Sequence, residues 1–178
     1  MVITQASLPP RTALEVFRLL PEGTLCEVLN DTLYMSPAPR YTHQRMVSFL
    51  NRRLGDFVED NNLGEVIISP IDVYFTDQKS ALQPDLIFIT PENRGILHDD
   101  GYFYGAPDLV VEVLSQDIKR DTVTKKAIYE KAGVKEYIMV NPSTLSVKTL
   151  LLGDGVYKEV FSGRGVFKSE LLNATFPL

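Results

Sequence analysis

The sequence predicts a mixed α/β (α+β) fold with a central sheet, on the strength of three observations. A long segment with apolar residues at helical spacing, from about residue 42 to 60, is followed by several short apolar runs of strand length. Residues 106–142 then have the pattern strand, helix, strand, which is typical of a parallel crossover. A hairpin pattern precedes the long helix, and more strand patterns follow the crossover. This order indicates helices layered against a mixed sheet.

The length and composition are those of one soluble globular domain. The chain has 178 residues, of which 44% are apolar and 23% charged, enough for a substantial core. Its net charge of −5 argues against broad adhesion to nucleic acid or anionic membranes, although a local basic groove is compatible with it. We find neither an apolar run of membrane-spanning length nor a signal-peptide pattern, so we expect a cytoplasmic protein without membrane contact. One cysteine and two histidines are too few for a zinc site of thiolates and imidazoles.

The elements expected before the crossover are a short helix, a hairpin, a long helix and a group of strands. They cover residues 10–20, 25–29 with 33–35, 42–60, 64–69 with 71–76, and 84–89. The turn pair Asn30-Asp31 supports the hairpin. The patterns at 64–76 are two strands, or one strand bent at Pro70. Residues 1–9 are expected to be loose, and 91–105 to form a polar loop.

The crossover and the strands after it complete the predicted domain. Its strands cover 109–114 and 136–140, and Gly133 ends the helix between them. A second hairpin is expected at 145–152 with 155–161, whereas the tail is weakly patterned. We predict one domain over residues 1–178. Its parts are a core at about 42–142, an N-terminal helix and hairpin at 10–36, and C-terminal strands at 145–168.

Two acids stand in strand patterns where a carboxylate is poorly solvated. Glu112 lies in the middle of the apolar run 109–114, and Asp85 opens the apolar run 86–89. Burying an ionised carboxylate is costly unless a cation or hydrogen-bond donors compensate it. Consecutive strands are often neighbours about 4.8 Å apart, so the two acids could share a Mg²⁺ or Mn²⁺ ion. Solvent or an arginine partner explains either acid alone more simply, but the two together favour a site.

The crossover helix is rich in lysine and arginine. A lysine on this helix would face an acid on the preceding strand, where it could orient a water or neutralise charge on a phosphate. Spacing alone, however, favours a solvated basic face in which Asp121 and Lys125 form an ordinary i,i+4 pair. The pattern by itself therefore selects no single lysine.

Three other residues are second-tier candidates. His43 and Gln44 lie near the start of the long helix, where a capping or core-edge histidine is the simpler interpretation. Glu27 is an acid within an apolar strand, and it is either a further ligand or the outward position of the hairpin. The chain has no glycine-rich phosphate loop, and Ser115 and Ser143 have no histidine nearby to activate them, which argues against P-loop and serine-hydrolase chemistry.

Motifs spread over most of the chain are specific when taken together. They are Ser36-Pro37-Ala38-Pro39, His43-Gln44, Pro84-Asp85, Pro107–Ser115, and Lys125-x-x-x-Tyr129-x-x-Ala132-Gly133-Val134-x-Glu136-Tyr137. With the hairpin around Glu27 and the pair Asn141-Pro142, they resemble the Uma-type putative restriction endonucleases. That family belongs to the PD-(D/E)xK nuclease superfamily.

The resemblance implies a restriction-endonuclease-like core of helix, three strands, helix and strand, and metal-dependent hydrolysis of phosphodiester bonds in DNA. It assigns Asp85 and Glu112 as ligands of Mg²⁺ (or Mn²⁺). The superfamily lysine is expected two residues after Glu112, where this chain has Leu114. In this family the lysine lies on the following helix, and Lys125 matches that position. Lys125 would position the attacking water, and the adjacent Lys126 is a second-tier candidate for the same role.

Two other interpretations remain open at the level of sequence. A catalytically inactive nuclease-like module would bind nucleic acid or a protein partner without cutting, and its DNA affinity would fall steeply with salt. An assembly protein would instead pair the strands after residue 145 between subunits. A homodimer is compatible with the nuclease interpretation, because cutting both strands of DNA often needs two sites.

Overall fold

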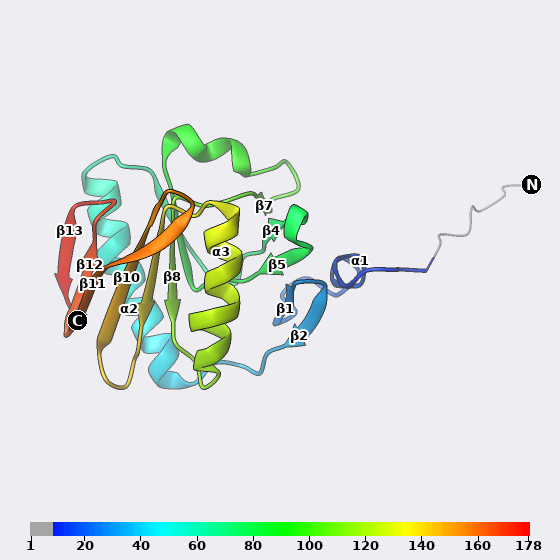
Figure 1. Cartoon of the computed structure of the whole chain (residues 1–178), viewed down its shortest axis with the longest axis horizontal. Helices are drawn as coiled ribbons and strands as arrows, with labels where there is room; N and C mark the ends of the chain where they lie inside the picture. The colour runs from blue at the N-terminus through cyan, green and yellow to red at the C-terminus, as the bar shows by residue number, and fades with distance from the viewer. Residues whose placement is uncertain (1–8) are drawn as a thin grey trace, which may run out of the picture.

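A computed structural model describes residues 9–178 as two β-sheets, a two-stranded ribbon and the helices that pack on them (Figure 1). The helical segments are α1 (Ala13–Phe17), α2 (Tyr41–Asp60), η1 (Thr76–Gln78), η2 (Pro91–Ile96), the π-helical η3 (Arg120–Lys125) and α3 (Lys126–Ala132). None of the helices formed by residues 9–178 is both long and apolar enough to cross a membrane. The expectation for residues 1–8 lies outside the described residues.

The strands form one larger and one smaller sheet. The six-stranded sheet has the order β11 (Val156–Arg164), β10 (Ser146–Gly153), β9 (Glu136–Val140), β8 (Leu109–Val113), β6 (Leu86–Ile89) and β3 (Glu65–Ile68). The five-stranded sheet has the order β2 (Thr32–Met35), β1 (Cys26–Leu29), β5 (Ser80–Leu82), β4 (Val73–Phe75) and β7 (Phe103–Tyr104). The ribbon pairs β12 (Val166–Ser169) with β13 (Ala174–Pro177).

The predicted core order is confirmed. Helix α2 is followed by β3, β6 and β8, then by η3 and α3, and then by β9, which is helix, three strands, helix, strand. Strands β3, β6 and β8 pair antiparallel, whereas β8 and β9 pair parallel across the crossover. Gly133 ends α3 with φ +91°, a left-handed conformation that glycine adopts without a steric penalty. Both predicted hairpins, β1–β2 and β10–β11, are also present.

The strand patterns at 64–76 form two strands, and they belong to different sheets. Strand β3 is at the edge of the six-stranded sheet, while β4 pairs with β5 and β7 in the other. The chain turns between them at Ser69 and Pro70. The sequence did not predict β5, which has three residues, or β7, which has two, because such short strands carry no periodic pattern. The expected C-terminal strands at 145–168 reach into β12, but its pairing with β13 in the weakly patterned tail was not predicted.

Successive side chains of a strand point to opposite faces, so the core is divided between the two faces of the six-stranded sheet. Leu86 and Val111 point to the face covered by α2 and the ribbon, where Leu50 and Leu54 of α2 pack. The neighbouring positions 87 and 110 point to the opposite face, which packs against α3 and the five-stranded sheet. Figure 1 shows α3 and α2 on opposite sides of this sheet. A side chain at position 112 therefore faces α3.

The five-stranded sheet has a small core of its own. Cys26 and Val28 of β1 are buried against Phe17 of α1 and Tyr74 of β4. Cys26 is completely buried, and burial raises the pKa of its thiol. Glu27 lies between these two residues and, by strand alternation, points the other way. That direction is towards α3 and the larger sheet.

Candidate active site

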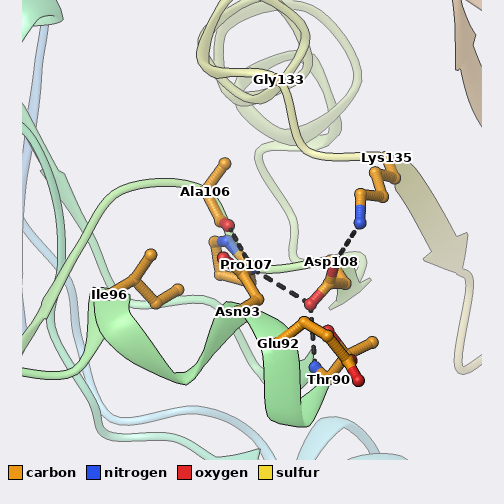
Figure 2. Close-up of a pocket in the computed structure, with 9 residues that line it drawn as sticks. All are labelled: Thr90, Glu92, Asn93, Ile96, Ala106, Pro107, Asp108, Gly133 and Lys135. Atoms are coloured by element: carbon orange, nitrogen blue, oxygen red, sulfur yellow. Dashed lines mark hydrogen bonds and ion pairs between the residues drawn. The ribbon is translucent and has the colours of Figure 1, made fainter.

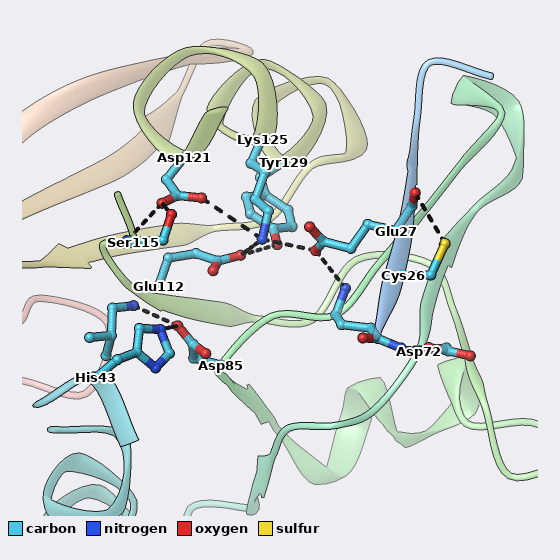
Figure 3. Close-up of polar contacts among 12 residues, drawn as sticks. Cys26, Glu27, His43, Asp72, Asp85, Glu112, Ser115, Asp121, Lys125 and Tyr129 are labelled. Carbon is cyan, nitrogen blue, oxygen red and sulfur yellow. Dashed lines mark hydrogen bonds and ion pairs between the residues drawn. The ribbon is translucent and has the colours of Figure 1, made fainter. Parts of the chain in front are cut away.

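Asp85 and Glu112 meet where β6 and β8 lie side by side. The strands pair with Leu86 opposite Val111, so one further step along the register sets Asp85 opposite Glu112. The Asp85 carboxylate continues the ladder, since its Oδ2 accepts a hydrogen bond from the backbone N–H of Val113 at 2.8 Å. Both acids are buried, with 9% and 3% of their surface exposed. The expectation that consecutive strands bring the two acids together is therefore met (Figure 3).

His43 reaches Asp85 from the first turn of α2. Its Nε2 lies 3.2 Å from Asp85 Oδ2, while its Nδ1 is buried without a hydrogen-bond partner among residues 9–178. Burial lowers the pKa of His43, but the contact with Asp85 outweighs burial and raises the pKa above its ordinary value. The histidine is therefore not a helix cap. Gln44, the other candidate on this turn, is exposed to solvent.

Glu112 is held by two donors from the crossover helix. Its Oε1 accepts a hydrogen bond from Lys125 Nζ at 3.0 Å and one from the Tyr129 hydroxyl at 2.7 Å. Burial raises the pKa of Glu112 well above its ordinary value. The charge of Lys125 opposes this effect, while the carboxylates of Asp85 and Asp121 add to it. The position thus combines a buried acid, a paired cation and a local excess of negative charge.

Lys125 is the lysine that reaches the acids. It ends the π-helical segment η3 and is only 5% exposed, so the solvated basic face favoured by spacing alone is wrong at this position. Burial lowers the pKa of its amine, but Glu112, Glu27 and Asp121 outweigh burial and raise it. Lys126 points elsewhere, since its Nζ lies 3.3 Å from Glu130 Oε2.

Two more carboxylates complete the surroundings of the Lys125 ammonium. Glu27 Oε1 lies 2.8 Å from Nζ, and Asp121 Oδ1 lies 3.9 Å from it. Figure 3 shows Glu27 approaching from β1, on the side opposite Asp121. Asp121 also accepts hydrogen bonds of 3.3 Å from the backbone N–H and the hydroxyl of Ser115. Glu27 is therefore not an outward-facing hairpin residue.

Asp121 and Tyr129 were not among the predicted site residues. Together with Lys125 they are spaced four residues apart, and this spacing could have assigned all three to one side of the helix. What the sequence did not indicate was that this side is buried. The exposed side of the same helix carries Lys119 and Lys131, which resemble Lys125 in sequence alone.

A hollow of about 390 Å³ lies at the beginning of β8, away from Glu112 (Figure 2). Asp108 at its base accepts hydrogen bonds from the backbone N–H of Thr90 at 2.8 Å and the side chain of Asn93 at 3.0 Å. Lys135 pairs with its other oxygen at 2.6 Å. Because both oxygens are already bound, Asp108 joins neighbouring loops and is not a free ligand.

The oxygen atoms of Asp85 and Glu112 suit a hard divalent cation. Each carboxylate has one oxygen, Oδ1 of Asp85 and Oε2 of Glu112, that enters no hydrogen bond or ion pair among residues 9–178. In the same part of the chain, no group of three or more His, Cys, Asp or Glu side chains is arranged to hold a metal. Within these residues, Asp85 and Glu112 therefore form a candidate pair of donors and not a complete metal-binding group.

Comparison with known proteins points to one family. The family described as Uma2, putative restriction endonuclease, matches residues 13–175. A search of curated proteins gave no match. Among solved structures, the chain is similar to a putative nuclease belonging to DUF820 from Anabaena variabilis. The two share 18% sequence identity with a TM-score of 0.72, and the alignment covers 92% of each chain. At this identity the likeness establishes the fold.

Proposed function

Since the chain belongs to the Uma2 family of putative restriction endonucleases, we propose that it is a metal-dependent endonuclease that hydrolyses phosphodiester bonds of DNA. One observation carries the proposal. Asp85 directly precedes β6 and Glu112 lies on the neighbouring β8, and a buried lysine contacts Glu112. Within residues 9–178, each acid has one carboxylate oxygen without a hydrogen bond or ion pair. Two acids and a lysine in this arrangement suit metal-assisted attack of water on a phosphate.

Asp85 and Glu112 would hold Mg²⁺ or Mn²⁺ through their free oxygens. When bound, such an ion polarises a phosphate oxygen and makes water more acidic. The buried site has more carboxylates than cations, because Glu27, Asp85, Glu112 and Asp121 surround Lys125 and His43. A divalent cation would offset this excess, which supports the assignment.

Lys125 would act as a fixed cation and not as a base. Its raised pKa keeps the amine protonated at neutral pH, so it cannot accept the proton of an attacking water. Two of its three N–H groups are directed to Glu27 and Glu112 at 2.8 and 3.0 Å. The third is available to orient a water or a phosphate oxygen. Its charge would stabilise the negative charge that develops in the transition state.

His43 would hold the Asp85 carboxylate in place. The contact of 3.2 Å uses Oδ2, the same oxygen that accepts the Val113 N–H, and leaves Oδ1 for the cation. Groups that bind a ligand's second oxygen commonly fix its orientation at metal sites. This role explains why a histidine with no capping function stands at the start of α2.

The test compares nicking of supercoiled plasmid by wild type, Asp85→Asn, Glu112→Gln and a control, Asp154→Asn. Asp154 is an exposed aspartate at the β10–β11 turn that pairs with Lys158. We expect Mg²⁺-dependent nicking by wild type and by the control, and a loss of about a hundredfold or more in the two site variants. Calorimetric titration of Mg²⁺ should show binding to wild type and none to Asp85→Asn.

Nicking that survives Asp85→Ala or Glu112→Ala would contradict the proposal. DNA binding by a wild-type protein that cuts with neither Mg²⁺ nor Mn²⁺ would instead identify an inactive nuclease-like module. Its affinity should then fall steeply as salt is raised, because counterions are released from the phosphates.

A further inference from the structure

The Lys125 ammonium has a second anchor outside the strands that carry Asp85 and Glu112. Its shortest contact, 2.8 Å, is with Glu27 Oε1, and the contact with Glu112 is 3.0 Å. Glu27 comes from β1 in the five-stranded sheet, while Glu112 comes from the six-stranded sheet. The lysine thus contacts one carboxylate from each sheet, and both carboxylates are almost completely buried.

Glu27 is itself held by backbone. Its Oε1 accepts a hydrogen bond of 2.9 Å from the N–H of Gln83, the residue directly after β5. Strand β1 pairs with β5 on one side and with β2 on the other, so both ends of this connection belong to one sheet. The segment before β5 is also tied to α3, since the side chain of Gln78 in η1 donates to the Ile128 carbonyl at 3.0 Å. An acceptor fixed in this way can set the position of a flexible partner.

A lysine side chain needs such an anchor more than most groups do. Its four-carbon stem is flexible, and its ammonium can donate in several directions. Glu112 alone would fix the distance from one side and leave the amine free to swing about that contact. A second carboxylate on another element removes this freedom and directs the remaining N–H group.

From this geometry we propose that Glu27 is a positioning residue, which holds the Lys125 ammonium at Glu112 for the hydrolysis described above. The inference rests on the proposed function. A positioning role for Glu27 differs from a metal-ligand role. Glu27 contacts Lys125 and Gln83, whereas the proposed ligand Asp85 contacts His43 and Val113, so Glu27 and Asp85 share no partner among these contacts.

The experiment measures kcat, KM, Mg²⁺ affinity and the urea midpoint for a set of full-length variants. Glu27→Met removes the acceptor at similar volume, and Glu27→Gln keeps an oxygen at the same place. Lys125→Met and the double variant Glu27→Met/Lys125→Met complete a double-mutant cycle. Glu136→Gln is the matched control, because Glu136 is another fully buried glutamate, bonded to Ser169 and Glu170.

We expect Glu27→Met to lower kcat by about a hundredfold, the typical effect of displacing a reacting group by about 1 Å. KM and Mg²⁺ affinity should stay within about threefold of wild type, and Glu27→Gln should recover most of the kcat. In the Lys125→Met background, Glu27→Met should change kcat by less than about twofold. Glu136→Gln should keep the wild-type kcat whatever its urea midpoint.

Each contrary result overturns the inference in a recognisable way. Wild-type kcat in Glu27→Met would remove the positioning role, and loss of Mg²⁺ binding would make Glu27 a ligand. An equal loss of kcat with and without Lys125 would show that Glu27 acts independently of it. If wild type itself does not cut DNA, the proposed function fails. The urea midpoints still test the anchor in that case, since Glu27→Met should recover part of the midpoint lost in Lys125→Met.

Discussion

Asp108 illustrates how one buried carboxylate can be fully satisfied by its neighbours. Burial disfavours its charged form, but Lys135 and the N–H groups of Thr90 and Asn93 outweigh burial and lower its pKa. An amide at this position would set an NH₂ group against the same donors. We expect Asp108→Asn to lower the free energy of unfolding by about 2–4 kcal/mol at pH 7, as measured in urea.

The pH dependence of this effect follows from the direction of the pKa shift. A carboxyl group with a lowered folded-state pKa contributes stability above its unfolded pKa and loses it as pH falls through the folded value. The difference in free energy of unfolding between wild type and Asp108→Asn should therefore be constant from pH 5 to 7 and shrink below about pH 4. Asp154→Asn is the control, because the Asp154 side chain is 94% exposed and pairs with Lys158 on the surface. A gap that widens in acid would contradict the assignment.

The sequence singled out a candidate site residue where the neighbouring residues along the chain made it unusual. Glu112 and Asp85 stood out as acids in apolar runs, and both are buried side by side. Lys125 did not stand out, because its burial depends on Glu27, almost a hundred positions earlier in the chain. Only the family resemblance selected it. Its catalytic role, like the metal-binding roles of the two acids, stays a prediction.

At the scale of elements, Glu136 joins the C-terminal ribbon to the central sheet. This first residue of β9 accepts hydrogen bonds from the Ser169 hydroxyl at 2.5 Å and from the N–H of Glu170 at 2.6 Å. We expect Glu136→Ala to lower the free energy of unfolding by about 2–3 kcal/mol, because the buried Ser169 hydroxyl and the partly buried Glu170 N–H lose their acceptor. Amide hydrogen exchange should become faster in β12 and β13 first.

Glu159→Ala provides a matched control for that change. Glu159 lies on β11 and pairs with Lys148 at 2.8 Å, with about half of each side chain exposed. Such surface pairs contribute about 0–1 kcal/mol, so exchange in the ribbon should be unaffected. If amide exchange in β12 and β13 is as slow in Glu136→Ala as in wild type, other contacts hold the ribbon in place.

Elements with an apolar run or a turn signal were predictable, including the four-residue strands β1, β2, β3 and β6, whereas the other short strands were not. Helix α2 and the strands of the crossover have enough residues for a periodic pattern, and each was found close to its predicted bounds. Strands β5, β7, β12 and β13 have two to four residues, and their pairing is decided by partners elsewhere in the chain. The π-helical turn of η3 likewise has no sequence pattern of its own.

At the scale of the whole molecule, Lys125 links the two sheets through Glu27 and Glu112. Removing one member of a buried ion pair leaves the others uncompensated, which typically costs about 3–5 kcal/mol. We expect Lys125→Met to lose about this much stability in urea at pH 7. Lys126→Met should lose less than about 1 kcal/mol, because the Lys126 side chain is 32% exposed and pairs with Glu130.

The loss of unfolding free energy caused by Lys125→Met should become smaller as the pH is lowered. The raised pKa of Lys125 means that its contribution is fully present below the ordinary lysine pKa, so the amine stays charged throughout this range. The carboxylates are the groups that change. The pKa of Glu112 is already raised by burial. Once Glu112 is protonated, wild type loses its attraction to Lys125, an attraction that Lys125→Met never has. The stability gap should therefore narrow from pH 7 towards pH 4.5, and a constant gap would contradict this account.

The sequence by itself determined the order of the core elements, the two hairpins and the pairing of Asp85 with Glu112. These features follow from local periodicity, turn residues and the adjacency of consecutive strands. Only the tertiary structure decided which lysine reaches the acids, where Glu27 points and which sheet each short strand joins. Those outcomes depend on contacts between residues far apart in the chain, and burial at such contacts leaves no local pattern.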